Sequence, residues 1–301
     1  MASAGTSQRP DRVTLAAFGL FVTLAGGNVV AIRYISCETC ELDPFWAAAS
    51  RFLVASLIFL AIALALRTGF PRGRALVGAV LYGVLGFGAP FAFAYWGLQK
   101  VSAGLGAVLL ATVPLLTFAF ALAHRQERFR WEGLAGGVLA VGGMIVIFRD
   151  GFDTGVPFAS LVALLAAAAC FAEVAIVVKA FPAVHPAALN AIGLGVGGLM
   201  LLVLTLAFSE AHVLPERART WIPQVYLIVL GSVVVFTLYL FVLRRWTASA
   251  VSYEGVLIPL VAILLSVWLQ DERITWAFAI GSVLVLIGVY FGVLRRPGAH
   301  D

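Results

Sequence analysis

A single glutamate interrupts one of the most apolar stretches of the chain, VSYEGVLIPL at 251–260. An ionised carboxylate deep in a membrane segment costs roughly 2.5–3.5 kcal/mol or more, so its presence there points to a function. With Tyr253 beside it, Glu254 could accept a proton or bind a substrate amine in a polar cavity. The alternative is a structural hydrogen bond to a neighbouring helix, made by a carboxyl that burial keeps neutral.

Asn28, Tyr82 and Glu173 are also unusual in apolar surroundings. Asn28 and Glu173 occupy matching places in two similar halves of the chain, and they either line a cavity or join neighbouring helices by hydrogen bonds. Tyr82 lies deep in its own segment and is a further cavity candidate. Arg51 could clamp a substrate carboxylate with its planar guanidinium. We favour a structural role for Arg51, in which it reaches toward the membrane surface or pairs with the outer acidic loop.

Two prolines and a short polar and aromatic cluster could serve the opening and closing of such a cavity. Pro114 and Pro259 each remove one backbone hydrogen bond and can bend the helices that contain them. These bends would suit a gate, or they would shape a static fold. Tyr95, Trp96 and Gln99 lie together at the end of an apolar segment. They either form an outer vestibule or belong to the aromatic belt found at membrane surfaces.

Ten long apolar segments must position these residues. The chain has 301 residues, of which 62% are hydrophobic and 12% charged, whereas soluble domains are roughly 45–50% apolar and about 25% charged. Each segment has close to the ~20 residues that a membrane helix needs, and none shows the alternation of a membrane barrel. We therefore expect an all-α polytopic membrane protein. Its expected transmembrane helices span 13–35, 45–66, 75–97, 103–123, 131–148, 156–178, 187–208, 222–243, 248–269 and 274–293.

The distribution of charge indicates an orientation in the membrane. The formal net charge is +5, but the positive side chains are scattered over short loops, which does not suggest binding to nucleic acid. With the N-terminus in the cytoplasm, thirteen of the 20 Lys and Arg fall in inner segments and six in outer ones, as the positive-inside rule requires. We expect a protein of the cell (inner) membrane with both termini cytoplasmic and with the lipid bilayer, not nucleic acid, around it.

The three cysteines do not predict a metal site. Cys37 and Cys40 form a CxxC in the outer loop after the first segment, and Cys170 lies within a later segment. A metal site needs about four ligands, and the sequence offers no second CxxC or His pair. On the oxidising side of the membrane the pair is expected as a disulfide or as two free thiols. Neither a metal nor an organic cofactor is expected.

An internal duplication runs through the chain. The stretch TVPLLTFAFALAHRQERFRWEGLAGG at 112–137 matches LIPLVAILLSVWLQDERITWAFAIGS at 257–282, with the prolines, the Glu-Arg pairs, the tryptophans and a glycine all 145 positions apart. The same offset relates VLG at 84–86 to VLG at 229–231. One offset held over so many marked residues indicates a duplicated unit.

Each unit contains five segments, so residues 1–150 and 151–301 are expected to be two five-helix repeats. Because five is odd, the second repeat enters the membrane from the opposite side. Such inverted repeats are typical of secondary transporters, whose substrate sites lie near the membrane midplane between the repeats. Glu127 and Glu272 mark matching segment ends, where helix capping or an interfacial ion pair is the expected role.

These features together resemble the drug/metabolite transporter superfamily, EamA type. The resemblance rests on the ten segments, the tandem halves and, in each half, a proline followed about 12 residues later by Glu and then by a Gly-rich segment. PFWAAASRFLVASL at 44–57 matches the Pro-then-Arg arrangement of the family's second helix, whereas LQDE at 269–272 departs from the family's Leu-Gly-Glu. The resemblance implies secondary transport, with export as its direction. It also implies a central cavity lined by the first, third, fourth, sixth, eighth and ninth helices.

Three other functions fit the sequence less well. An intramembrane enzyme would need a nucleophile with a base, or paired metal ligands, at membrane depth. The four histidines fall in loops or at helix ends, and the sequence has no GxSxG, HExxH or Walker A motif. A channel would need a ring of like groups from an oligomer. Exchange of sugar phosphates or nucleotide sugars would need several deep cations, whereas the interior offers Arg51 and Lys179 at most.

The sequence therefore predicts a transporter, not an enzyme. Its expected substrates are small organic metabolites such as amino acids or amine-bearing solutes, because two buried glutamates suit a substrate amine. Proton coupling is an open alternative, and the chain is expected to act as a monomer or homodimer.

Overall fold

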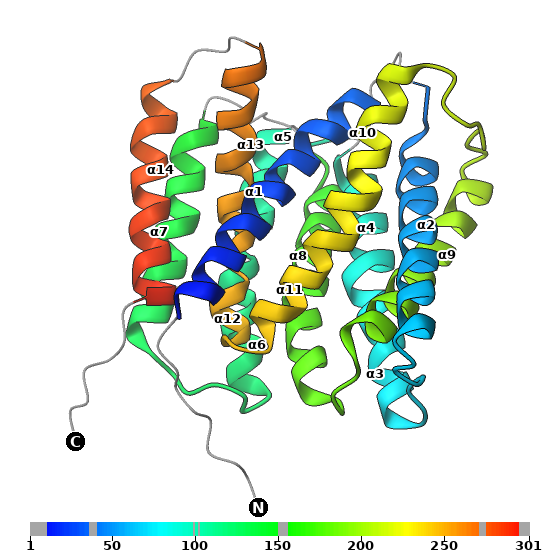
Figure 1. Ribbon diagram of the computed structural model, residues 1–301. Helices are drawn as coiled ribbons and strands as arrows, with labels where there is room; N and C mark the ends of the chain where they lie inside the picture. Colours follow the sequence, from blue (N-terminus) through cyan, green and yellow to red (C-terminus); the bar gives the residue numbers. More distant parts are fainter. Residues whose placement is uncertain are drawn as a thin grey trace, which may run out of the picture.

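The computed structural model describes residues 11–35, 41–98, 100–101, 103–149, 156–270 and 275–294. All regular structure within these ranges is helical, and ten spans are long and apolar enough to cross a membrane. The helices stand side by side, and α1 begins at the same end of the bundle at which α14 ends (Figure 1). We call this end the terminus end. The expected ten-helix all-α fold is confirmed.

Several spans are interrupted. The five spans of the first repeat are α1 (Arg12–Ile35); α2 (Pro44–Ala65); α3 (Arg74–Gly83) with η1 (Val84–Gly88) and α4 (Ala89–Leu98); α5 (Ala103–Leu110) with α6 (Val113–Ala123); and α7 (Trp131–Phe148). Those of the second repeat are α8 (Phe158–Ala180); α9 (Pro186–Ala207); α10 (Ala218–Ile228) with η3 (Val229–Val234) and α11 (Val235–Leu243); α12 (Ala248–Val251) with α13 (Glu254–Gln270); and α14 (Trp276–Val289) with η4 (Tyr290–Leu294).

Local sequence explains where several helices begin. Pro44 and Pro186 open α2 and α9, where a residue without an N–H and with a fixed φ is well tolerated. The hydroxyls of Thr247 and Thr275 accept hydrogen bonds from the first turns of α12 and α14, which is the usual N-cap arrangement. The eighth span begins at Ala218, four residues before the expected start.

Two π-helical turns lie at equivalent places in the two repeats. The turns η1 and η3 begin at Val84 and Val229, which are 145 positions apart. They interrupt the third and eighth spans at the VLG sequence that the repeats share. A π-helical turn shifts the backbone hydrogen-bond register and is found frequently at functional sites. The duplication therefore preserves a local irregularity as well as the helices.

The contact between α7 and α14 depends on glycine. A Cβ atom added at Gly143 would lie 2.6 Å from the carbonyl oxygen of Gly281, and one at Gly136 would lie 2.6 Å from that of Gly288. The two contacts are equivalent in the repeat, because Gly143 and Gly288 are 145 positions apart, as are Gly136 and Gly281. A twofold relation between the two helices produces such a pair of equivalent contacts. The absence of side chains at these positions lets the two backbones approach closely.

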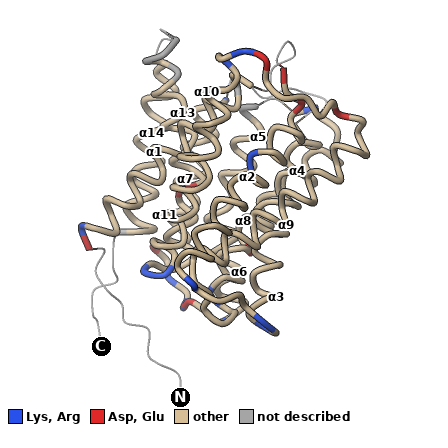
Figure 2. Tube along the Cα trace, turned by 45° about the vertical axis from the view of Figure 1, so that its right-hand side comes forward, with Lys and Arg blue, Asp and Glu red and all other residues tan. Residues whose placement is uncertain are grey.

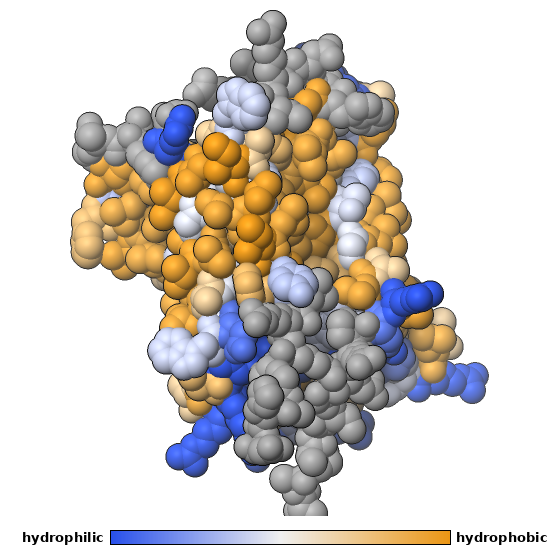
Figure 3. Space-filling view, turned by 90° about the vertical axis from the view of Figure 1, so that its left-hand side faces the viewer, coloured by the Kyte–Doolittle hydropathy of each residue, from blue (hydrophilic) through white to orange (hydrophobic). Residues whose placement is uncertain are grey.

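The outer surface suits a bilayer. Charged residues gather mainly at the two ends of the bundle (Figure 2), and the face that carries α7 and α14 has a broad hydrophobic band across its middle (Figure 3). Exposed side chains such as Leu57, Leu64, Ile222 and Val283 are all more than half accessible. In a membrane protein these residues face lipid.

At the end of the bundle opposite the termini, an acidic side chain joins the two repeats by hydrogen bonds. Glu210, in the connection after α9, accepts hydrogen bonds from the backbone N–H groups of Phe45 at 3.2 Å and Trp46 at 2.8 Å. Glu210 thereby caps α2 from the other repeat. Partial burial raises the pKa of Glu210 above its usual range, against the lowering effect of these two hydrogen bonds.

We predict that Gly143→Val lowers the thermal stability of the purified protein, because the added side chain meets the Gly281 backbone and overpacking costs about 1–3 kcal/mol. Gly142→Val is the matched control, since a Cβ atom at Gly142 meets nothing within 4 Å. Melting temperatures in detergent would measure the effect. Equal melting temperatures for the two variants would contradict the close contact.

Candidate functional site

A cavity of about 740 Å³ lies between the two repeats. All six spans expected from the resemblance contribute to it, and α2 and α7 add one residue each. Its walls are mainly apolar and include Phe21, Phe87, Phe91, Phe171 and Phe236. The polar lining residues are Asn28, Arg51, Tyr82, Tyr239, Ser252 and Glu254.

The cavity extends toward the end of the bundle opposite the termini. Ile32, Leu98 and Phe148 line it and lie at or near the last residues of α1, α4 and α7. These three helices all run away from the terminus end. Glu254, at the start of α13, lines the cavity farther from the end of the bundle opposite the termini.

Hydrogen bonds between the repeats join the helices at the terminus end. The Glu127 carboxylate accepts from the backbone N–H and the hydroxyl of Ser249, at 3.0 and 2.5 Å, and so caps α12. The Gln126 amide donates to the carbonyl of Ile176 at 2.9 Å. The expected capping role of Glu127 is thus seen across the repeats.

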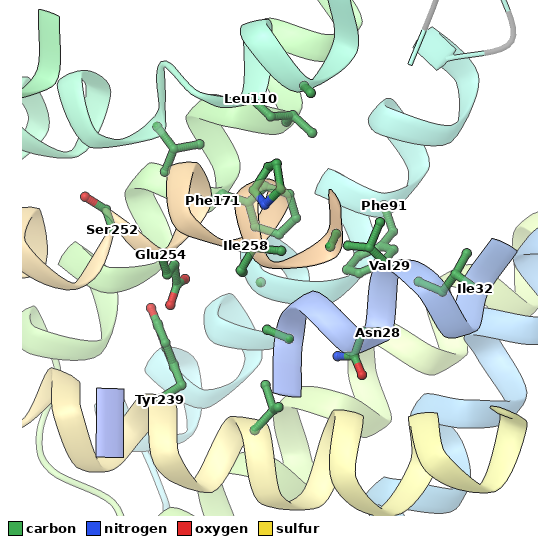
Figure 4. A pocket seen from close by; sticks show the side chains of 18 of the residues that line it. Asn28, Val29, Ile32, Phe91, Leu110, Phe171, Tyr239, Ser252, Glu254 and Ile258 are labelled. Atoms are coloured by element: carbon green, nitrogen blue, oxygen red, sulfur yellow. The ribbon is translucent and has the colours of Figure 1, made fainter. Parts of the chain in front are cut away.

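Glu254 is the first residue of α13, and a break at Ser252 and Tyr253 separates α13 from α12. Its side chain lines the cavity, and its Oε2 atom is buried without a hydrogen-bond partner among the described residues. The hydroxyl of Tyr239, on α11, points toward the carboxylate (Figure 4). A negative charge at a helix N-terminus is favoured by the backbone dipoles. A carboxyl group so placed can bind a cation or a proton from the cavity.

The two matched prolines occupy different local structures. Pro259 lies inside α13 and lines the cavity. Because proline has no N–H, the carbonyl of Gly255 lacks its usual helical donor. Pro114 lies buried at the start of α6, directly after the break between α5 and α6. The breaks themselves fall at non-equivalent positions of the repeat, Ala111 to Thr112 and Ser252 to Tyr253. Whether either proline serves as a gate stays a prediction.

Tyr82 and Asn28 line the cavity and also bind neighbouring helices. The hydroxyl of Tyr82 donates to Oδ1 of Asn190, on α9, at 3.0 Å. The amide of Asn28 donates to the carbonyl of Gly231, in η3, at 3.0 Å. Both side chains therefore join neighbouring helices by hydrogen bonds and also form part of the cavity wall.

Tyr253 and Glu173 are not among the cavity-lining residues. Tyr253 lies in the break between α12 and α13, and its hydroxyl donates to the carbonyl of Gly133, on α7, at 3.3 Å. Glu173 lies 3.2 Å from the His124 imidazole, at the terminus end. Neither residue joins Glu254 in the wall of this cavity, and a direct role for either in binding a solute stays a prediction.

Tyr95 and Trp96, two of the three expected vestibule residues, also lie outside the cavity wall. Tyr95 packs edge-on against Phe45, with ring centroids 4.3 Å apart, and Trp96 is 43% exposed on the surface. Gln99 lies outside the described residues, as do Cys37 and Cys40. The positions of Tyr95 and Trp96 fit the belt of aromatic residues at a membrane surface.

Sequence reasoning did not identify Tyr239. It follows Ser232 by seven residues in the eighth span. A second polar residue about two turns after the first in an apolar helix is the signal that predicts it. The sequence places Arg51 in the second span but does not predict its burial against η3.

The chain matches known membrane transporters over nearly its whole length. The model of the EamA-like transporter family matches residues 14–149 and again 158–294. The uncharacterized inner membrane transporter YedA of Escherichia coli K12 is 26% identical over 91% of this chain and 90% of its own. A probable terminal-alkyne amino-acid exporter of Streptantibioticus cattleyicolor is 29% identical over 80% of each chain. A crystal structure with 18% identity has a TM-score of 0.80 over 95% of this chain and 98% of its own, which supports the fold.

The two family matches, one to each five-helix half, correspond to the duplication seen in the sequence and in the glycine contacts. The matching family is a family of transporters and not of enzymes. The chain is a multi-pass membrane transporter and belongs to the EamA-like transporter family.

Proposed function

We propose that the protein exports small amine-bearing metabolites, amino acids above all, in exchange for protons. The observation that carries this proposal is the Glu254 carboxyl, which faces a largely apolar cavity and has an oxygen without a partner among the described residues. A lone carboxylate in such surroundings is stabilised by a bound cation or neutralised by a proton. A substrate ammonium and a proton would therefore compete for the same group.

The exchange follows from this competition. With the termini in the cytoplasm, the cavity faces outward, and an incoming proton displaces the ammonium from Glu254. When the site faces inward, the proton leaves and another ammonium binds. One proton then enters for each amine-bearing solute exported. The similarity to a probable amino-acid exporter agrees with this substrate class.

Exchange of phosphorylated sugars is the weaker candidate. Polyanions need several cations, but Arg51 is the one cation among the described lining residues. Lys179, the other deep cation of the sequence, donates to the carbonyl of Trp246 at 2.7 Å and is not part of the lining.

The first test compares Glu254→Gln with Glu173→Gln in proteoliposomes. We expect Glu254→Gln to reduce pH-gradient-driven uptake of labelled amino acids by at least about tenfold, because the amide cannot exchange a proton. Glu173→Gln makes the same chemical change in a residue that does not line the cavity, and it should retain uptake. Normal uptake by Glu254→Gln, with an unchanged dependence on the pH gradient, would refute the proposal.

The second test separates two tyrosines near Glu254. Tyr239→Phe should weaken amino-acid transport, because its hydroxyl points toward the carboxylate (Figure 4). Tyr253→Phe should leave transport intact. It should lower the free energy of unfolding by about 1 kcal/mol, because one buried hydrogen bond is lost, and so lower the melting temperature. Transport rates and melting temperatures of both variants would be measured. If instead Tyr253→Phe weakened transport and Tyr239→Phe did not, the functional hydroxyl would be that of Tyr253.

The third test concerns orientation. A fluorescent protein that matures only in the cytoplasm, fused to the C-terminus, should fluoresce in cells, because the positive-inside rule puts both termini inside. A periplasmic alkaline phosphatase fused at the same point should be inactive. Active phosphatase would reverse the assigned orientation and, with it, the side to which the cavity faces.

A further inference from the structure

Arg51 is a buried cation with no counter-charge among the described residues. Its side chain is 4% exposed and lines the cavity. Its Nε atom donates to the hydroxyl oxygen of Ser232 at 2.9 Å, and Nη2 is 3.5 Å from the carbonyl oxygen of Gly231. No carboxylate of the described residues lies within ion-pair distance. A guanidinium has five N–H donors, so three have no protein acceptor in the described part of the chain.

The π-helical turn η3 holds this guanidinium in place. The hydroxyl of Ser232 donates its own hydrogen to the carbonyl of Leu227 at 2.9 Å, so a lone pair remains to accept from Arg51 Nε. The carbonyl of Gly231 also accepts from Asn28. The aromatic ring of Phe52 lies 4.8 Å from the guanidinium carbon. These neighbours orient the charge without neutralising it.

Burying a charge without a partner is costly, and an arginine fork matches a carboxylate in shape and in hydrogen bonds. We propose that Arg51 is the subsite for the carboxylate of the transported solute. This inference rests on the proposed function, in which Glu254 binds the amine. Together the two residues assign the substrate to zwitterions with an apolar side chain, so that neither simple amines nor simple acids satisfy both ends of the site.

The eighth span relates the two ends of the site. Ser232, which anchors Arg51, lies in η3, and Tyr239, which points toward Glu254, follows seven residues later in α11 (Figure 4). Val235 and Phe236 line the cavity between them and provide an apolar wall for the side chain of the solute.

The test uses three compounds that differ in charge and share one carbon skeleton: leucine, 3-methylbutylamine and 4-methylpentanoate. Apparent Kd values would come from ligand-induced shifts in the melting temperature of the detergent-purified protein. Wild type should bind leucine more tightly than either analogue. Arg51→Gln should raise the apparent Kd of leucine and of the acid by at least about tenfold and leave that of the amine unchanged. Glu254→Gln should raise the apparent Kd of leucine and of the amine and leave that of the acid unchanged.

Ser232→Ala provides a milder variant, should Arg51→Gln fail to give a folded protein. It keeps the charge but removes one anchor, and it should weaken leucine and the acid by about three- to tenfold with the amine unaffected. If Arg51→Gln, or in its place Ser232→Ala, weakens all three compounds alike or none of them, Arg51 is purely structural and the subsite is refuted. If the wild-type protein bound neither leucine nor the amine, the proposed function itself would be refuted.

Discussion

Backbone hydrogen bonding within the bilayer is the constraint on which the rest of this structure depends. No water is available to an unpaired carbonyl in the hydrocarbon region, so irregular backbone survives only where protein or a polar cavity satisfies it. The π-helical turn η3, which interrupts the eighth span, meets that condition. The carbonyl of Gly231, in η3, is taken up by Asn28 and Arg51. The polar residues of the cavity thus serve first to satisfy the irregular helix beside it.

The same irregularity gives the site its chemistry. A regular eighth span would pair the carbonyl of Gly231 within the helix and leave Arg51 without its present anchors. The π-helical turn holds the guanidinium by uncharged acceptors, which orient the positive charge but leave it able to attract an anion. Glu254 is placed by the break between α12 and α13 in an analogous way. Two opposite charges consequently face one apolar cavity from different helices.

Symmetry and asymmetry have separate roles. The glycine contacts between α7 and α14 are equivalent under the repeat, so this helix pair forms a symmetric support away from the polar site. Beside the cavity the equivalence fails, because Asn28 donates to η3 whereas its repeat mate Glu173 lies beside His124. Two repeats with the same fold thus differ around the cavity, and Arg51 and Glu254 reach its wall from different repeats.

The sequence by itself determined the ten helices, the duplication and the presence of Glu254 in an apolar span, because each depends on local composition or on a fixed spacing. It also determined that the glycines of α7 and α14 are equivalent. Only the tertiary structure decided which polar side chains meet. Tyr253 and Glu254 are neighbours in sequence, yet the break before α13 turns one toward α7 and the other into the cavity. Arg51 could not be assigned from sequence, because its partners lie 180 residues away on a turn whose hydrogen-bond register no local pattern reveals.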